Sequence, residues 1–381
     1  MSRLPRLSPA SEEFPTLDAL RFLSSIGIVL FHTRLALDLS AEARAISDRF
    51  DGLANLVDLF FAISGFVICH VYHARMDSWA HYGRYMRNRV ARIAPLHWLT
   101  LAFFVALASA FALRHPQLPT PPLYNWHCVV PNIFFLQSFG LCANPTHNFV
   151  SWSISAEMGC YLLFPVFLYL LRRSVWLPAL AAMVMIALLS LAGPAGLSDT
   201  AWGTWTAEGG ILRALPGFTM GIFYYAIRQW LARIPKPHLL SLIALAAFFM
   251  LPALGLNPLW SPLLAYGVVA IAVGADAAPR RATGLAALMR KIAPLGQLTY
   301  SLYMLQVPVL LTGFNFAVIH LLHLNGLARN AMILCGIALL IPVSYVSLFV
   351  FEFPVRRWIA RLGAPRASKS DTLDTADRLA P

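Results

Sequence analysis

Long apolar stretches alternate with short polar segments along almost the whole chain. A helix needs about 20 apolar residues to cross the roughly 30 Å hydrocarbon core of a bilayer. We therefore expect an all-α polytopic membrane protein, a bundle of about ten transmembrane helices. The ten stretches that come near the required length are residues 17–35, 55–73, 94–113, 150–171, 176–193, 209–227, 238–255, 259–275, 294–322 and 330–351.

The basic residues follow this alternation. If every stretch crosses the membrane once, most of the 29 lysines and arginines fall in segments on the same side. Cytoplasmic loops are enriched in these residues, so the pattern predicts that both termini are cytoplasmic. We divide the chain into an N-terminal cytoplasmic tail (1–14), a membrane-embedded domain (15–360) and a polar cytoplasmic tail (361–381).

Composition agrees with a membrane protein, since 59% of residues are hydrophobic and only 12% are charged, against about 25% charged in soluble domains. The net charge of +12 lies in short segments between apolar stretches, which argues against a nucleic-acid partner. The histidines and cysteines lack metal-ligand spacing, so we expect no metal site. Cys128 and Cys142 share an outer loop, where a disulfide and two free thiols are equally compatible with the sequence.

The first apolar stretch carries Arg21 and His32, which are separated by eleven positions. At 100° per residue their directions differ by about 20°, so both leave one face of a helix, together with Asp18 and Ser25. An arginine within a membrane span is costly unless it faces a polar cavity or a partner. We expect this face to line a polar site. The alternative is that Arg21 reaches the interface and His32 is a hydrogen-bonded packing residue.

The fourth stretch carries Ser153, Glu157 and Tyr161 at helical spacing on one face. An intramembrane carboxylate is a functional candidate, and it is expected to have a basic partner nearby. The alternative is a structural ion pair that holds helices together, for which Arg213 is a candidate partner.

Arg89 and Arg92 precede the third apolar stretch at a spacing of three residues. Guanidinium groups bind phosphate and pyrophosphate through paired hydrogen bonds. These two residues are therefore candidates to bind a cytoplasmic polyanion such as an acyl-coenzyme A.

Other polar residues of the apolar stretches are candidates to line a pore or to bind an acceptor. The pair Ser64-Gly65 also suits simple helix packing, and Pro308 is expected to loosen the helix near Gln306. The full set of such candidates is Asp58, Ser64, Ser153, Tyr161, Tyr300 and Gln306.

With these residues assembled, the chain resembles the acyltransferase-3 family of integral-membrane acyltransferases, which includes bacterial sugar O-acetyltransferases. The resemblance covers about residues 17–358 and rests on six elements in order. They are Leu17-Asp-Ala-Leu-Arg21 with ten residues before His32, Asp58-Leu-Phe-Phe-Ala-Ile-Ser-Gly-Phe66, Arg89-Val-Ala-Arg92-Ile-Ala-Pro95, Ser151-Trp-Ser-Ile-Ser-Ala-Glu157, Thr299-Tyr-Ser-Leu-Tyr303 and Glu352-Phe-Pro354.

The resemblance implies a bundle in the bacterial inner membrane that moves an acyl group, by family precedent acetyl, from cytoplasmic acyl-coenzyme A to a hydroxyl of a carbohydrate or glycolipid. Acetyl-coenzyme A would be a co-substrate, with no bound cofactor. Roles in activity carry over to Arg21, His32, Arg89, Arg92 and Glu157. The family often has a histidine where this chain has Gln306, which cannot take up a proton.

Acyl transfer to a hydroxyl needs a base and a positive site for the developing oxyanion. We expect His32 to be the base, with Glu157 orienting it or binding acceptor hydroxyls. Direct transfer and a covalent relay through the imidazole are both open. The competing interpretation is a transporter or flippase of a lipid-linked sugar or small amphiphile, which the Arg89/Arg92 pair and the lack of an inverted repeat disfavour.

Overall fold

The computed structural model describes Pro5, Leu7 and residues 14–192, 202–250, 261–278 and 284–361. All regular secondary structure in these ranges is helical, as expected. The two tails assigned from sequence, 1–14 and 361–381, lie almost entirely outside the described residues.

Seven helical segments in these ranges are long and apolar enough to cross a membrane. Three shorter apolar helices occupy the other stretches predicted from the sequence: α7 (Leu177–Ala192), α9 (Pro237–Met250) and α10 (Ser261–Ala277). The seven longer segments contain α1 (Pro15–Thr33), α3 (Leu56–Tyr72), α4 (Trp79–Arg114), α6 (Trp152–Arg173), α8 (Gly210–Leu231), α11 to α12 (within 284–321) and α13 to α14 (within 326–361).

Helix α4 begins much earlier than the sequence pattern predicted for the stretch 94–113. It starts at Trp79, where the Ser78 hydroxyl accepts a hydrogen bond from the His81 amide at 3.3 Å. The polar residues before position 94 hid this start from a hydrophobicity pattern, although arginine, tyrosine and methionine are compatible with a helix. Arg89 and Arg92 therefore lie inside a helix, about two turns and one turn before Pro95.

The last two apolar stretches are broken, as Pro308 led us to expect for the first of them. A proline ring removes one backbone donor and displaces the helical hydrogen-bond register, and π-helical turns mark such positions. In order the segments are α11 (Gly284–Ile292), a 3₁₀ turn (Ala293–Leu298), α12 (Thr299–Leu305), π-helical segments (Gln306–Phe314 and Ala317–Leu321), α13 (Gly326–Val346), a further π-helical segment (Ser347–Glu352) and α14 (Phe353–Arg361).

Two short helices that the apolar pattern did not predict lie between the long ones, α2 (Ala41–Asp48) and α5 (Val129–Ile133). In the loop that contains α5, Cys128 and Cys142 form a disulfide with their Cα atoms 5.9 Å apart. Of the two alternatives compatible with the sequence, the structure therefore contains the disulfide.

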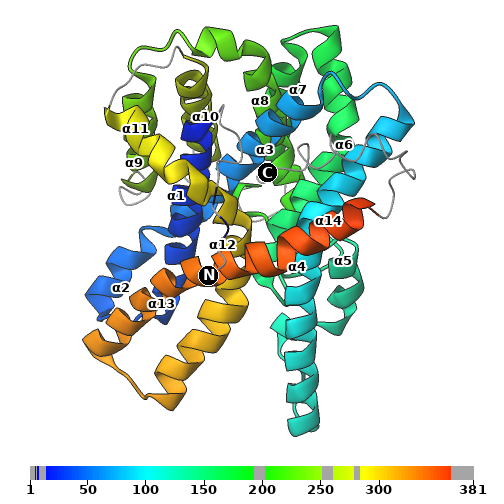
Figure 1. Ribbon diagram of the computed structural model, residues 1–381. Coiled ribbons are helices and arrows are strands. Elements are labelled where there is room, and N and C mark those ends of the chain that lie inside the picture. The colour runs from blue at the N-terminus through cyan, green and yellow to red at the C-terminus, as the bar shows by residue number, and fades with distance from the viewer. Residues whose placement is uncertain are drawn as a thin grey trace.

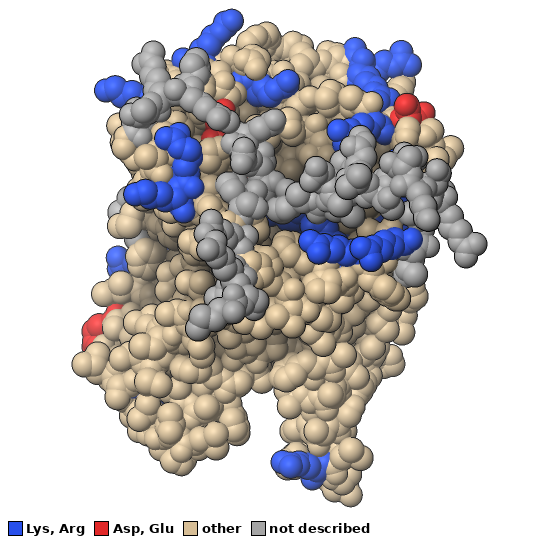
Figure 2. Space-filling view, viewed as in Figure 1, with Lys and Arg blue, Asp and Glu red and all other residues tan. Residues whose placement is uncertain are grey.

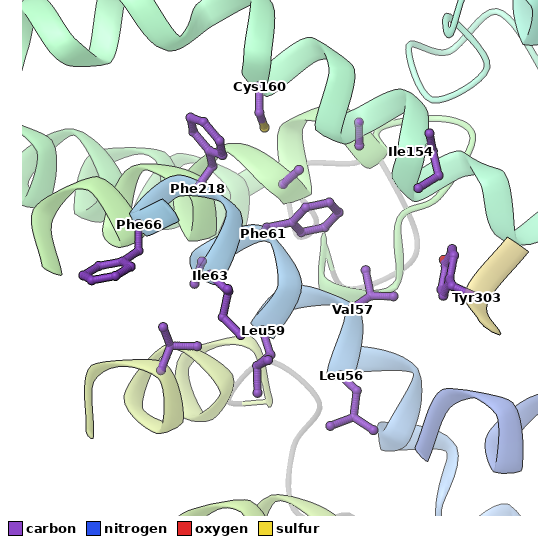
Figure 3. Packing of buried hydrophobic residues seen from close by; sticks show 14 of the residues in the cluster. Leu56, Val57, Leu59, Phe61, Ile63, Phe66, Ile154, Cys160, Phe218 and Tyr303 are labelled. Atoms are coloured by element: carbon purple, nitrogen blue, oxygen red, sulfur yellow. The ribbon is translucent and has the colours of Figure 1, made fainter. Parts of the chain in front are cut away.

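Helix α3 lies in the middle of the bundle and packs against α6, α8 and α10 (Figure 1). Figure 3 shows its apolar side chains, among them Phe61 and Phe66, directed into the surrounding core beside Phe218 of α8. The backbones of α3 and α8 approach closely. A Cβ atom at Gly65 would lie 1.9 Å from the Phe218 carbonyl oxygen, and one at Gly221 would lie 2.0 Å from that of Ala62.

Helix α1 is fixed at its N-terminal end by α10. The amides of Thr16 and Leu17 donate hydrogen bonds of 2.9 and 3.0 Å to the two carboxylate oxygens of Asp276. The first amides of a helix have no hydrogen-bond partner within the helix. A carboxylate there accepts their hydrogen bonds and interacts favourably with the positive end of the helix dipole. At the other end of the chain, α14 crosses α4 (Figure 1).

Candidate active site

A cavity of about 660 Å³ lies between α1, α3, α4, α6, α12 and α14. Helices far apart in the sequence form its walls, and polar side chains from each of them reach it. Eight residues singled out from the sequence line this cavity: Arg21, Ser64, Arg89, Arg92, Ser153, Glu157, Tyr161 and Tyr300. The structure leaves three others out of its lining, namely His32, Asp58 and Gln306.

Four arginines converge on the cavity. Arg21 comes from α1 and Arg89 and Arg92 come from α4, while Arg356 comes from α14. Arg92 lies within electrostatic range of the other three. Two carboxylates, those of Asp18 and Glu157, are found among the described lining residues, and Asp18 pairs with Arg21 at 3.5 Å. The cavity thus has an excess of positive charge.

Arg89 is held in place by aromatic residues while part of its guanidinium is left without a partner. Its Nη2 donates a 3.2 Å hydrogen bond to the Tyr72 hydroxyl, and the group lies over the rings of Tyr72 and Tyr161. Its Nε is buried, and no described residue accepts a hydrogen bond from it. A buried donor without a partner is costly, so the site suits an anionic guest.

Glu157 forms a compact polar cluster in the same cavity. Its Oε1 accepts hydrogen bonds from the Ser64 hydroxyl at 2.7 Å and from the Tyr161 hydroxyl at 2.5 Å. Ser64 therefore has a role beyond helix packing, because its hydroxyl holds the Glu157 carboxylate. These hydrogen bonds fix the Glu157 carboxylate without involving a basic side chain, and its position in the cavity leaves it available to a ligand hydroxyl.

Asp58 and Arg213 form a separate, fully buried ion pair. Arg213 donates from Nε to Oδ1 of Asp58 at 3.1 Å and from Nη2 to Oδ2 at 2.8 Å. It also donates to Asn55 at 2.9 Å and lies over the ring of Trp152. The sequence interpretation made Asp58 a candidate to line the cavity and Arg213 a candidate partner of Glu157. Both are corrected, because these two residues neutralise each other away from the cavity.

His32 and Gln306 are brought together outside the cavity lining. The ring Nδ1 lies 3.0 Å from Oε1 of Gln306, whose Nε2 donates a 3.0 Å hydrogen bond to the Tyr303 carbonyl. That second bond fixes the amide orientation, so Oε1 faces the histidine. Because Oε1 only accepts, Nδ1 carries the proton, and in the neutral ring Nε2 carries the free lone pair.

Tyr303 links this pair to the cavity. Its side chain lines the cavity beside Ser153, whose hydroxyl donates a 2.7 Å hydrogen bond to the Tyr303 hydroxyl. The Tyr303 hydroxyl in turn donates to the Val150 carbonyl at 2.8 Å. Tyr303 thus contributes its side chain to the cavity and its backbone carbonyl to Gln306. Its spacing of three residues before Gln306 was the sequence signal that could have singled it out.

The remaining candidate, Tyr300, donates a short hydrogen bond to the Ile93 carbonyl and joins α12 to α4. Arg356 was read from the sequence only as a topological charge. It lies four residues, about one helical turn, after Glu352, the first residue of a recognised motif, and that spacing was the available signal. Within the ranges that the structure describes, no group of three or more histidine, cysteine or acidic side chains is arranged to hold a metal ion.

Comparisons with known proteins find relatives that are named as acyltransferases. Acyltransferase MdmB of Streptomyces mycarofaciens is 31% identical over 181 residues, covering 44% of this chain and 42% of that protein. Peptidoglycan O-acetyltransferase OatA of Listeria monocytogenes is 24% identical over 202 residues, covering 50% of this chain and 28% of that protein. The chain thus matches less than half the length of these relatives, and no solved structure matches it.

A family model described as an acyltransferase domain, Acyl_transf_3, matches residues 14–349. This range contains the cavity-lining parts of α1, α3, α4, α6 and α12 described above. The chain therefore belongs to the acyltransferase-3 family and is an acyltransferase.

Proposed function

We propose that this acyltransferase takes an acyl group, acetyl by family precedent, from acyl-coenzyme A on the cytoplasmic side and transfers it to a hydroxyl of a carbohydrate or glycolipid. The observation that carries the proposal is the cavity in which Arg21, Arg89, Arg92 and Arg356 meet. Coenzyme A presents a diphosphate and a further phosphate, for which guanidinium groups are suited partners. Family membership favours this enzyme over the transporter interpretation.

The proposed donor matches the distribution of groups along α1. Arg21 lines the cavity, and His32 lies about 16 Å further along the helix axis at 1.5 Å per residue. An extended pantetheine arm spans much of such a distance. In our proposal Arg89 and Arg92 hold phosphates, Arg21 contacts the pantetheine end, and the thioester approaches Tyr303.

The chemistry assigned to His32 follows from its hydrogen bond to Gln306. In the proposed reaction Nε2 removes the proton from the acceptor hydroxyl, and the oxygen attacks the thioester carbonyl. The carbon–sulfur bond then breaks, and the proton passes from the imidazolium to the departing thiolate. Gln306 keeps Nδ1 protonated and the ring oriented. His32 does not line the cavity, so this reaction requires a movement that brings the thioester and the acceptor hydroxyl to its ring.

Glu157 has a different proposed role from the base. Its carboxylate accepts hydrogen bonds from Ser64 and Tyr161, and none of its described hydrogen bonds involves His32. Of the two roles considered from the sequence, we therefore favour binding of hydroxyl groups over orientation of the imidazole. Ser153 and Tyr161 would contribute further polar contacts to the bound molecule.

For the membrane arrangement we propose ten crossings with both termini in the cytoplasm of a bacterial cell, in its inner membrane. The seven long segments and the three shorter apolar helices together supply that number. Figure 2 supports a sided arrangement, since lysines and arginines gather on the upper half of the viewed face and are sparse on the lower half. The positive half would face the cytoplasm.

The proposal is tested by supplying radiolabelled acetyl-coenzyme A to membrane vesicles that contain the wild type or the His32→Ala variant. We expect labelled, O-acetylated glycan or glycolipid with the wild type, and a rate lower by about 100-fold or more in the variant, as for loss of a general base. Equal labelling by both proteins would remove His32 from the mechanism. No transfer by a folded wild type supplied with glycan acceptors would contradict the proposed function.

A further inference from the structure

Helix α14 presents one residue pair to the cavity and the opposite side to the surroundings. Arg356 and Ala360, one turn apart, line the cavity. Arg357 is exposed, and Trp358 is 60% exposed. Position 356 is thus distinguished from its neighbours in α14 by the direction of its side chain.

The π-helical turn that precedes α14 fixes the position of Arg356. Oε1 of the buried Glu352 accepts hydrogen bonds from Ser301 at 2.6 Å and Ser347 at 2.8 Å. These bonds join α12 to the start of α14. Glu352 is the acidic residue nearest in sequence to Arg356. Because its carboxylate is hydrogen-bonded to these two serines, it has a structural role.

No described carboxylate lies within ion-pairing distance of Arg92 or Arg356. Both groups nevertheless converge on one cavity with Arg89, and Arg356 lies within electrostatic range of Arg89. Like charges gathered at low dielectric repel each other unless an anion joins them. The contrast with Arg213, which is neutralised by Asp58, marks the cavity arginines as groups for a ligand.

We infer that Arg356 binds a phosphate group of the acyl donor, completing with Arg89 and Arg92 a three-guanidinium site for the phosphorylated end of coenzyme A. The inference rests on the proposed function and extends it to a helix outside the matched residues 14–349. The diphosphate and the remaining phosphate of coenzyme A carry several anionic oxygens. If Arg89 and Arg92 each bind two of them in a bidentate contact, further oxygens still lack a cationic partner. Arg356 supplies the additional contact from α14, which packs against α4.

The test measures binding of coenzyme A and of pantetheine, which lacks the phosphates, to the purified full-length protein in detergent. Three variants are compared with the wild type: Arg356→Gln, Arg356→Lys and Arg357→Gln. The last changes the same charge on the neighbouring, exposed position. Thermal unfolding of each protein establishes that it is folded.

We expect Arg356→Gln to weaken binding of coenzyme A by about tenfold or more, the effect of losing a charge-assisted hydrogen bond, and to leave pantetheine binding unchanged. Arg356→Lys should recover part of the loss, and Arg357→Gln should bind as the wild type does. Equal binding of coenzyme A by Arg356→Gln and Arg357→Gln would overturn the inference alone. An equal loss for pantetheine would also overturn it, since the effect would then not concern phosphate. A folded wild type that binds no coenzyme A would overturn the proposed donor as well.

Discussion

Arginine side chains enter the helical bundle in two kinds of surroundings. Arg213 meets Asp58 and Asn55 and is completely enclosed, whereas Arg89 and Arg92 face a cavity and have no carboxylate partner among the described residues. Removing one member of a buried ion pair leaves the other charge unpaired, whereas a guanidinium that faces a cavity without a carboxylate partner is suited to bind an anion. The surroundings of each arginine thus separate structural from functional roles.

Breaking the buried pair should therefore harm the fold more than the site. We predict that Asp58→Ala or Arg213→Ala lowers stability by about 3–5 kcal/mol, because each leaves one buried charge unpaired. The double replacement Asp58→Leu with Arg213→Met removes both charges and should lose less than either single variant. Thermal denaturation in detergent measures this, and additive losses in the double variant would contradict a coupled pair.

Gln306 should affect the rate of transfer rather than donor binding. We predict that Gln306→Leu slows transfer by about tenfold, less than the loss of the base itself, because His32 keeps its ring but loses the group that fixes its tautomer. The KM for acetyl-coenzyme A should stay unchanged, since Gln306 lies outside the cavity lining. Steady-state kinetics separate the two constants, and a raised KM with an unchanged kcat would refute this role.

Single residues were predictable from sequence where helical spacing or an unusual polar group marked them. Arg21 and Glu157 stood out as charges within apolar stretches, and Arg89 and Arg92 stood out by their spacing just before one. All four line one cavity. Their partners were not predictable, since pairs such as Asp58 with Arg213 are 155 positions apart. Such contacts depend on helix packing that one sequence does not display.

At the scale of elements, the contact of α3 with α8 depends on glycines that let the backbones meet. We predict that Gly221→Ala is destabilising by about 1–3 kcal/mol or more, because its Cβ would overlap the Ala62 carbonyl, which cannot move aside without shifting a helix. Gly267→Ala is the matched control, as a Cβ there meets nothing within 4 Å. Equal thermal stability of the two variants would contradict the close packing.

The existence of most helices followed from apolar length, but their ends and irregularities did not. The start of α4 at Trp79 is set by a capping serine in a polar segment, where hydrophobic patterning gives no signal. The break near Pro308 was foreseeable because proline cannot donate a helical hydrogen bond. The π-helical turn before α14 has no comparable marker in the sequence. It is stabilised by hydrogen bonds that Glu352 accepts from the distant Ser301 and the neighbouring Ser347.

At the scale of the whole molecule, the proposed topology places the loop around Asn325 outside and the start of α4 inside the cell. In a Cys335→Ser background we predict that Asn325→Cys reacts with a membrane-impermeant maleimide in intact cells. Gly83→Cys should react only after the membrane is opened. Both positions are exposed, so exposure does not bias the comparison. Labelling of Gly83→Cys in intact cells would reverse the orientation.

The cavity itself belongs to this largest scale, because it exists only when α1, α4, α6 and α14 are assembled. The sequence order of motifs indicated a shared site but not which of them meet. His32 shares a helix with Arg21, yet it lies outside the cavity lining and contacts Gln306 there. In the proposed mechanism, donor binding and proton transfer therefore take place at separate positions along one helix.

The most direct test of the account supplies radiolabelled acetyl-coenzyme A, which does not cross membranes, to inverted and to right-side-out vesicles. The wild type, Arg89→Gln and Arg92→Gln are compared with Arg357→Gln as the exposed control. We predict transfer of label to the endogenous acceptor only in inverted vesicles, with a loss of about tenfold or more in the two cavity variants and none in the control. Equal transfer in right-side-out vesicles, or undiminished transfer by both cavity variants, would contradict entry of the donor through the arginine-lined cavity.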